Sequence, residues 1–287
     1  MFPDNLTFSI QEPINNFVDQ LITNYGDVFL IFSSWIIKLF IPIEMFLRQS
    51  PWWLIIIFIG LLAFFCSRSI KLSIFMVLLS FFMGMLGLWD EAMQTFTLIL
   101  VSTLFVVFIG LPLGIILSKS GKLRFFLLPI LDAMQTLPSF VYLIPVLMLF
   151  GLGKVPALIA TIIYSLPPII RLTDLGIRQV DNNIIDATDA FGASSFQKLV
   201  KVEIPLALPS IMVGINQATM MALSMVVIAS MIGNRGLGQE VLLGINTLDV
   251  GRGATAGLAI VAMAIVIDRI TQSYTLRLES MRGMHSN

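Results

Sequence analysis

The sequence predicts an all-α membrane protein of about seven transmembrane helices, with one further helix lying at the membrane interface near the N-terminus. Of the 287 residues, 57% are hydrophobic and only 12% are charged, against roughly 25% charged residues in an ordinary soluble domain. Apolar stretches long enough to cross a bilayer recur along the chain, and the basic residues favour one side of them. These three observations exclude a single water-soluble core.

Residues 1–50 are expected to form an external N-terminal tail and an interfacial helix. Residues 1–27 carry four acidic side chains and no basic one, so they lack the positive segment of a cleaved secretory signal. In the segment 28–47 the apolar run is interrupted by Lys38, Pro42 and Glu44. This pattern favours a helix lying on the membrane, and an additional span is the alternative.

Residues 51–274 are predicted to form the transmembrane domain. A helix needs about 20 mostly apolar residues to cross the hydrocarbon, and seven stretches meet this requirement. They are 51–67, 70–89, 92–118, 125–150, 154–174, 205–233 and 252–274. The remaining residues, 275–287, are expected to be a cytoplasmic tail.

The placement of basic residues predicts the orientation of these spans. With an external N-terminus, twelve of the 17 Lys and Arg residues fall on the inner side and five on the outer side, as the positive-inside rule requires. The outer five are Lys38, Arg48, Lys154, Arg235 and Arg252. The polar segment 181–203 is therefore predicted to be a cytoplasmic loop.

The first half of this loop has the pattern of a short helix that ends at a glycine. Asn183 is a candidate N-cap, and Asp186 follows near the positive end of the helix dipole. We expect a helix from Ile184 to Phe191, ended by a left-handed turn at Gly192.

The second half predicts another helix that leads back into the bilayer. Ser194 or Ser195 can cap it, and Pro205 marks the return to the membrane. Ala187, Ala190 and Phe191 fall on one face of the preceding helix, which suits docking into a groove on another protein. A solvated surface helix is the alternative.

Two strings in and after this loop resemble a known motif. DATDAFG (186–192) followed by IPLALP (204–209) resembles the EAA loop of ABC importer permeases. The chain departs from that motif in three ways: Asp186 stands for Glu, Thr188 stands for the second Ala, and the spacing from Gly192 to Ile204 is slightly longer.

Three further stretches strengthen the resemblance. LDAMQTLPSFVYLIPVLMLFGLG (131–153), LPPIIRLTDLGIRQV (166–180) and ALSMVVIASMIG (222–233) are similar to the permease subunit of glycine betaine/proline importers, which serve osmoprotection. The similarity covers about residues 89–271. It implies the transmembrane fold of a type I ABC importer in a bacterial inner membrane.

The resemblance also implies the partners of the chain: a second permease copy, two ATPase subunits and an external substrate-binding protein, all acting within membrane lipid and without nucleic acid. The loop would act as a coupling helix seated in a cleft of the ATPase. The residues assigned to this coupling are Asp186, Ala187, Asp189, Ala190, Phe191, Gly192, Ser195, Ile204 and Pro205.

No phosphate-binding loop of the G-x-x-x-x-G-K-[ST] type occurs in the sequence. ATP and Mg are therefore expected on the partner ATPase. For the chain itself we expect no bound cofactor, no metal site and no catalytic residue.

The span 125–150 is a candidate translocation pathway. Its prolines remove amides from the helix ladder, and irregular backbone at membrane depth is tolerated where protein or a water-filled cavity covers it. The candidate pathway or gate residues here are Gln135, Thr136, Pro138 and Tyr142. Kinks that serve packing are the alternative.

Three more polar residues within spans are candidates for the pathway or gate. Asn216 and Gln217 either bond to neighbouring helices or face a solvated cavity. Asp132 is expected to pair with Arg171 or Arg269 at a cytoplasmic gate, or else to reach interfacial water.

The sequence leaves alternatives open for the cargo and for the class of function. The same architecture would suit choline, carnitine or another small solute. A non-transporting membrane scaffold is a second possibility. An intramembrane enzyme using Asp132 with Asp268 or Tyr142 is a third, although no nucleophile and base are paired at a matched spacing.

Overall fold

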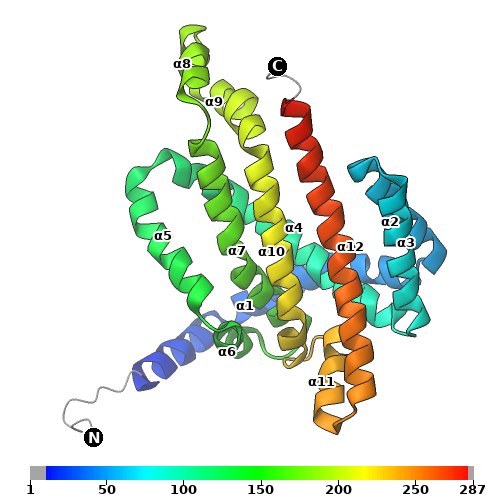
Figure 1. Ribbon diagram of the computed structural model, residues 1–287. Helices are drawn as coiled ribbons and strands as arrows, with labels where there is room; N and C mark the ends of the chain where they lie inside the picture. Colours follow the sequence, from blue (N-terminus) through cyan, green and yellow to red (C-terminus); the bar gives the residue numbers. More distant parts are fainter. Residues whose placement is uncertain (1–10, 284–287) are drawn as a thin grey trace, which may run out of the picture.

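The computed structural model describes residues 11–283, and within this range every regular element is helical (Figure 1). The helices are α1 Gln11–Gln49, α2 Trp52–Ser67, α3 Ile70–Met85, α4 Trp89–Lys119, α5 Gly121–Thr136, α6 Ser139–Phe150, α7 Lys154–Arg178, α8 Asn182–Ala190, α9 Ser195–Lys198, α10 Ile204–Ser230, α11 Leu237–Thr247 and α12 Val250–Gly283. A π-helical turn, Leu199–Glu203, joins α9 to α10. The predicted all-α class is confirmed.

Length and apolar composition qualify five of the described helical segments as membrane spans. These are α1, α4, α7, the segment Ser195–Ser230 and α12. The pair α5 and α6 adds a sixth if a helix bent by 99° counts as one span. The segment 125–150 is thus two helices, because Pro138 cannot donate its amide to the preceding turn.

The helix α2 keeps its predicted bounds to within one residue, and α3 ends at Met85, before the end of the predicted stretch 70–89. Each has 16 residues, or about 24 Å at 1.5 Å per residue, whereas the hydrocarbon is about 30 Å thick. They pack against each other and against α12. The sequence pattern therefore located both helices, although neither is long enough at right angles to the membrane to cross the whole hydrocarbon.

The centre of the bundle is formed by α4, α7 and α10, and glycines let these helices approach closely. An added Cβ on Gly110 of α4 would lie 2.2 Å from Cγ2 of Ile169 on α7. Two turns further along α7, a Cβ on Gly176 would lie 2.7 Å from Cβ of Ser210 on α10. Small residues at such contacts are the usual means of helix packing in membranes.

The first described helix, α1, is longer than predicted and runs across the direction of α7, α10 and α12 (Figure 1). Pro42 lies inside it without ending it. Glu44 is buried and its carboxylate pairs with Lys154 of α7 and, at 3.4 Å, with Arg48. The buried charge of Glu44 is thus paired, and α1 packs against α4, α6 and α7. Its surface or spanning position stays a prediction.

The helix α11 has no counterpart among the predicted spans. It begins after Gly236, where an added Cβ would lie 2.5 Å from Oγ1 of Thr95 on α4. The backbone N–H of Leu237 donates to the same Oγ1 at 2.8 Å. Arg252 of α12 then pairs with Glu240 at 2.7 Å, so α11 is tied to both neighbouring helices.

Candidate coupling loop and translocation pathway

The predicted loop projects from one end of the bundle as the helices α8 and α9 (Figure 1). The helix α8 begins at Asn182, and the carboxylate of Asp181 accepts the backbone N–H of Asn183 at 2.9 Å. The N-cap is therefore Asp181 and the predicted cap at Asn183 is wrong. Both positions carry a capping residue type, and only the backbone conformation decides between them.

The left-handed turn predicted at Gly192 is confirmed. This glycine has φ +76°, and a Cβ placed on it would meet no heavy atom within 4 Å. Glycine is therefore needed at this position for its backbone conformation and not for lack of space, because L-residues other than glycine are strained at positive φ.

A capping box starts the second helix of the loop. The N–H of Gln197 donates to Oγ of Ser194 at 3.3 Å, and the N–H of Ser194 donates to Oε1 of Gln197 at 3.0 Å. Ser194 is thus the cap, and Ser195 is the first residue of α9. The chain stays helical through the π turn to Ile204 and Pro205, where α10 begins.

An ion pair holds α8 and α9 together. Nζ of Lys198 lies 2.8 Å from both carboxylate oxygens of Asp189. Asp189 is therefore engaged within the loop, whereas Asp186 is exposed on α8.

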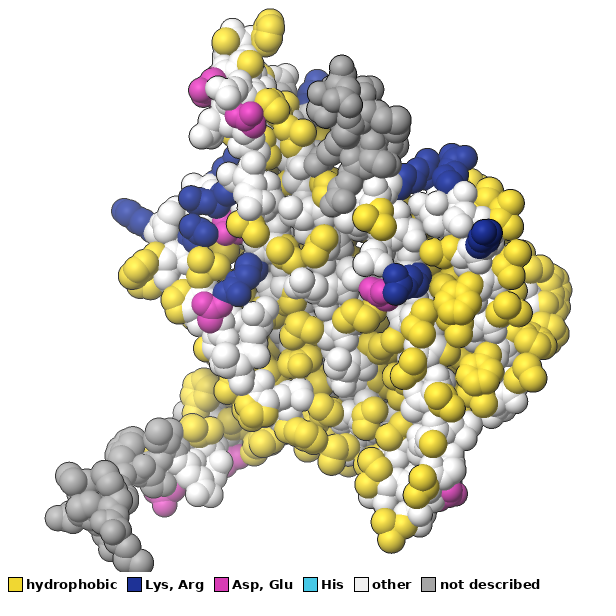
Figure 2. All heavy atoms as spheres, viewed as in Figure 1, with side chains coloured by type: hydrophobic (Ala, Val, Ile, Leu, Met, Phe, Trp, Pro, Cys, Tyr) yellow, Lys and Arg dark blue, Asp and Glu magenta, His cyan; other side chains and the backbone are white. Residues whose placement is uncertain are grey.

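The loop presents an apolar surface to its surroundings. Phe191 is 92% exposed and Phe196 is 74% exposed, and Ala187 and Ala190 are exposed beside them. Figure 2 shows hydrophobic side chains at this projecting end, with acidic ones close by. Exposed phenylalanines on a projecting polar loop are the kind of surface that another protein covers.

Two ion pairs that sequence reasoning missed lie at the base of the loop. Lys119 at the end of α4 pairs with the buried carboxylate of Glu203. Nε of Arg124 on α5 lies 3.1 Å from the buried carboxylate of Asp174 on α7. The partners are 84 and 50 residues apart, so no local spacing signals them.

The predicted pathway residues lie on either side of the bend between α5 and α6. Gln135, Thr136 and Pro138 are exposed. Tyr142 is buried, and its hydroxyl donates to the carbonyl of Met134 across the bend. The ring of Tyr142 also packs edge-on against Tyr164 of α7, with centroids 5.8 Å apart. Tyr142 thus holds the bend, while the other three residues form its surface.

Asp132 pairs with Arg171, one of the two partners expected for it. Nη1 of Arg171 also lies 3.5 Å from Oε1 of Gln135. Arg269, the other expected partner, bonds to Gln272 at 3.0 Å. The side chains of Asp132 and Arg171 are 56% and 39% exposed, so this pair lies on an open face that joins α5 to α7.

Asn216 bonds to a neighbouring helix. Its Nδ2 donates to Oδ1 of Asp268 on α12 at 3.0 Å, and its Oδ1 accepts the hydroxyl of Thr271. The next residue, Gln217, is exposed. The two amides therefore differ: Asn216 ties α10 to α12, and only Gln217 lies on an open face.

Comparison with known proteins places the chain in a transporter family. Residues 107–279 match the family described as binding-protein-dependent transport system inner membrane component. The glycine betaine/proline betaine transport system permease protein of Escherichia coli strain K12 is 56% identical over 190 residues, which cover 66% of this chain and 54% of that protein. The chain thus spans about half the length of this relative.

A second relative matches along nearly its whole length. The glycine betaine/carnitine transport permease protein of Listeria monocytogenes is 41% identical over 274 residues, covering 93% of this chain and 97% of the relative. An inward-facing structure of the MetNI methionine ABC transporter matches with a TM-score of 0.59 and 21% identity, over 64% of this chain and 93% of that one. This last match shows the fold alone.

The family match covers more than half of the chain, and 64% of the chain takes the fold of a solved importer. The chain therefore belongs to the binding-protein-dependent transport system inner membrane components, multi-pass permease proteins with the transmembrane fold of a type I ABC importer.

Proposed function

We propose that this chain is the transmembrane subunit of an ATP-driven importer for glycine betaine, proline betaine and similar compatible solutes. The observation that carries the proposal is the projecting pair α8 and α9, joined by the left-handed Gly192 and bearing the exposed Phe191. A relative matched along nearly its whole length has glycine betaine and carnitine in its name, which supports this cargo.

In the proposed mechanism, the loop transmits the closure of a partner ATPase to the bundle. Phe191 and its alanine neighbours enter a cleft of the ATPase, and the Asp189–Lys198 pair keeps α8 and α9 moving as one unit. The helix is continuous from Ser195 to Ser230, so a displacement of the loop is passed directly to α10. ATP binding then biases an alternating-access equilibrium of the permease.

The pathway is proposed to lie along the open face of the α5–α6 bend. Gln135, Thr136 and Pro138 line it, and the Asp132–Arg171 pair gates it by joining α5 to α7. Gln217 of α10 is assigned to the same open face. Asn216 keeps the packing role described above.

A second copy of the chain is proposed to cover this face. Large apolar side chains on α5 and α6, including Phe126, Phe140 and Ile144, are exposed beside the polar pathway residues. Two copies would bury the apolar positions and enclose the polar ones between them.

We propose the orientation from the distribution of charge. Figure 2 shows Lys and Arg side chains across the half of this face that carries α8 and α9, and apolar side chains over the other half. By the positive-inside rule, the loop end and the C-terminus are cytoplasmic and the N-terminus is external. The ATPase subunits, with ATP and Mg, dock from the cytoplasm, and a substrate-binding protein delivers cargo from outside.

Uptake of labelled glycine betaine into liposomes tests the proposal. The liposomes contain this protein with its ATPase and binding protein, with and without internal ATP. Accumulation that depends on ATP is expected. If ATPase activity responds to the binding protein but betaine does not accumulate, the cargo is choline, carnitine or another solute. If neither activity is found, a non-transporting scaffold takes the place of the proposed importer.

A further inference from the structure

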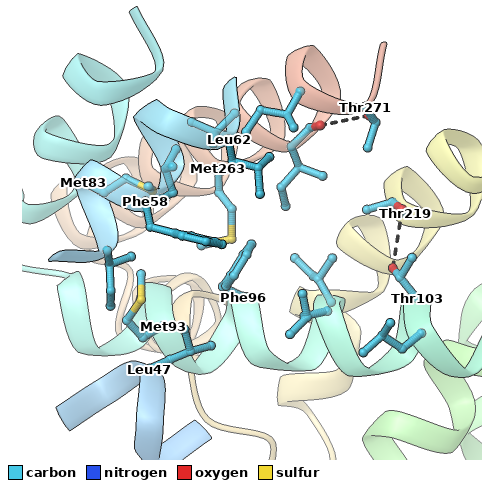
Figure 3. A pocket seen from close by; sticks show the side chains of 18 of the residues that line it. Leu47, Phe58, Leu62, Met83, Met93, Phe96, Thr103, Thr219, Met263 and Thr271 are labelled. Atoms are coloured by element: carbon cyan, nitrogen blue, oxygen red, sulfur yellow. Dashed lines mark hydrogen bonds between the residues drawn. The ribbon is translucent and has the colours of Figure 1, made fainter. Parts of the chain in front are cut away.

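We propose that a cavity in the membrane-embedded part of this protein binds one acyl chain of a membrane lipid. The cavity has a volume of about 440 Å³ and lies between α2, α4, α10 and α12, with the end of α1 at its edge (Figure 3). It is distinct from the open face of α5 and α6 assigned to the pathway.

The lining of the cavity is almost wholly apolar. Phe58 of α2, Phe96 of α4 and Met263 of α12 gather on one side of it (Figure 3). An apolar void of this kind is not expected to hold water, because a water molecule needs two to four polar partners.

The few hydroxyls at the border are already engaged. Thr219 donates to the carbonyl of Ile215 at 2.7 Å, and its Oγ1 lies 3.5 Å from that of Thr103. The hydroxyl of Thr271 donates to Asn216. A zwitterionic solute would find no free polar partner among these three threonines, which separates this cavity from a cargo site.

The cavity opens sideways, where a lipid would enter it. Three lining residues, Leu54 and Phe58 of α2 and Leu104 of α4, are 43%, 60% and 56% exposed. The helix α2 packs against α3 and α12, and the cavity separates its other side from α4. Since α4, α10 and α12 are long and apolar enough to cross a membrane, we expect the opening to face hydrocarbon.

The size of the cavity decides between a lipid chain and a protein helix. One turn of an α-helix with its side chains occupies about 400 Å³ or more, from a diameter of about 10 Å and a pitch of 5.4 Å. A cavity of about 440 Å³ would therefore hold a single turn and no spanning helix. An acyl chain is narrow and flexible enough to fill it, and burial against α10 would brace α2 across the gap.

A photoactivatable lipid tests this proposal in the assembled transporter. A phosphatidylglycerol with a diazirine in its acyl chain is added to the membrane and irradiated, and labelled peptides are mapped by mass spectrometry. Met263 is only 2% exposed, so lipid on the outer surface cannot reach it. Labelling of Met263 is expected, along with labelling of the outward-facing Phe108, which is 79% exposed.

Matched variants of α4 sharpen the test. Leu100 lines the cavity, whereas Leu113 on the same helix does not. We expect Leu100→Trp to reduce labelling of Met263 to the background of an unirradiated sample and Leu100→Ala to increase it. Leu113→Trp should change neither, and Phe108 should be labelled equally in all three variants.

Two outcomes would overturn the proposal. One is an unlabelled Met263 in the unmodified transporter while Phe108 is labelled, a result that needs no variant to fold. The other is labelling of Met263 by lipid in the isolated permease that disappears on assembly, because a protein segment would then be the occupant.

Discussion

Lys198 of α9 lies 2.8 Å from both carboxylate oxygens of Asp189 on α8, across the turn at Gly192. This contact joins the two halves of the projecting loop at a point where the backbone itself is a hinge. The relative orientation of α8 and α9 thus depends on one partly exposed ion pair and one glycine.

Breaking the ion pair should weaken coupling without unfolding the protein. The side chains of Lys198 and Asp189 are 19% and 50% exposed, and pairs near the surface contribute about 0.2–1 kcal/mol. We expect Lys198→Ala to lower ATP-dependent uptake severalfold while the thermal unfolding midpoint stays unchanged. The swap Asp189→Lys with Lys198→Asp should restore part of the uptake. Lys201→Ala, an exposed lysine of the adjacent π turn, is the control. An equal loss in this control would remove the pair from the coupling mechanism.

A bulky residue at Gly192 should uncouple transport from ATP hydrolysis. Left-handed backbone costs a non-glycine residue about 1–2 kcal/mol, and a β-branched side chain is the least tolerant. We expect Gly192→Val to retain ATPase activity but lose uptake, with Gly192→Ala intermediate. Gly121 at the start of α5 has equal space around it and no positive φ, so Gly121→Ala serves as the control. Normal uptake by Gly192→Val would contradict the role assigned to the turn.

The Asp132–Arg171 pair should act as a unit if it gates the pathway. Asp132→Asn and Arg171→Gln are each expected to change uptake, and the double variant should lose little more than either one, because both remove the same contact. Rates of uptake and of ATP hydrolysis measured on all three variants check this. Additive losses would assign the two residues to separate tasks.

Cysteines introduced on the α5–α6 bend should report its exposure to water. Those at Gln135 and Thr136 are expected to react with a charged thiol reagent in at least one nucleotide state. A cysteine at Tyr142 should be protected, because that side chain is buried. Cys66 is replaced beforehand to remove the native thiol. Complete protection at 135 and 136 in every state would show that this face does not line the pathway.

Asn216 should contribute more to stability than its neighbour Gln217. Asn216→Leu removes two bonds between α10 and α12 and leaves Asp268 without that donor. Polar contacts between membrane helices are worth about 0.6–2 kcal/mol, so the thermal unfolding midpoint should fall by a few degrees. Gln217→Leu changes an exposed position and should leave the midpoint unchanged. The reverse order would mean that Asn216 is not a packing residue.

The sequence by itself determined the features that depend on local order. Apolar stretches of about 20 residues located α4, α7, α10 and α12 because burial in hydrocarbon acts on each segment separately. The turn at Gly192 was predictable for a similar reason, since glycine readily adopts the conformation that ends a helix there. The two strings that resemble the EAA loop indicated the family before any geometry was known.

Only the tertiary structure decided which distant side chains meet. It paired Asp132 with Arg171 instead of Arg269, and it directed Asn216 toward α12 while Gln217 stayed exposed. It also bent the segment 125–150 at Pro138 and placed the apolar cavity beside α2. Charge pairs and cavities depend on how helices cross and which faces they present, and a one-dimensional pattern of apolar residues carries no such information.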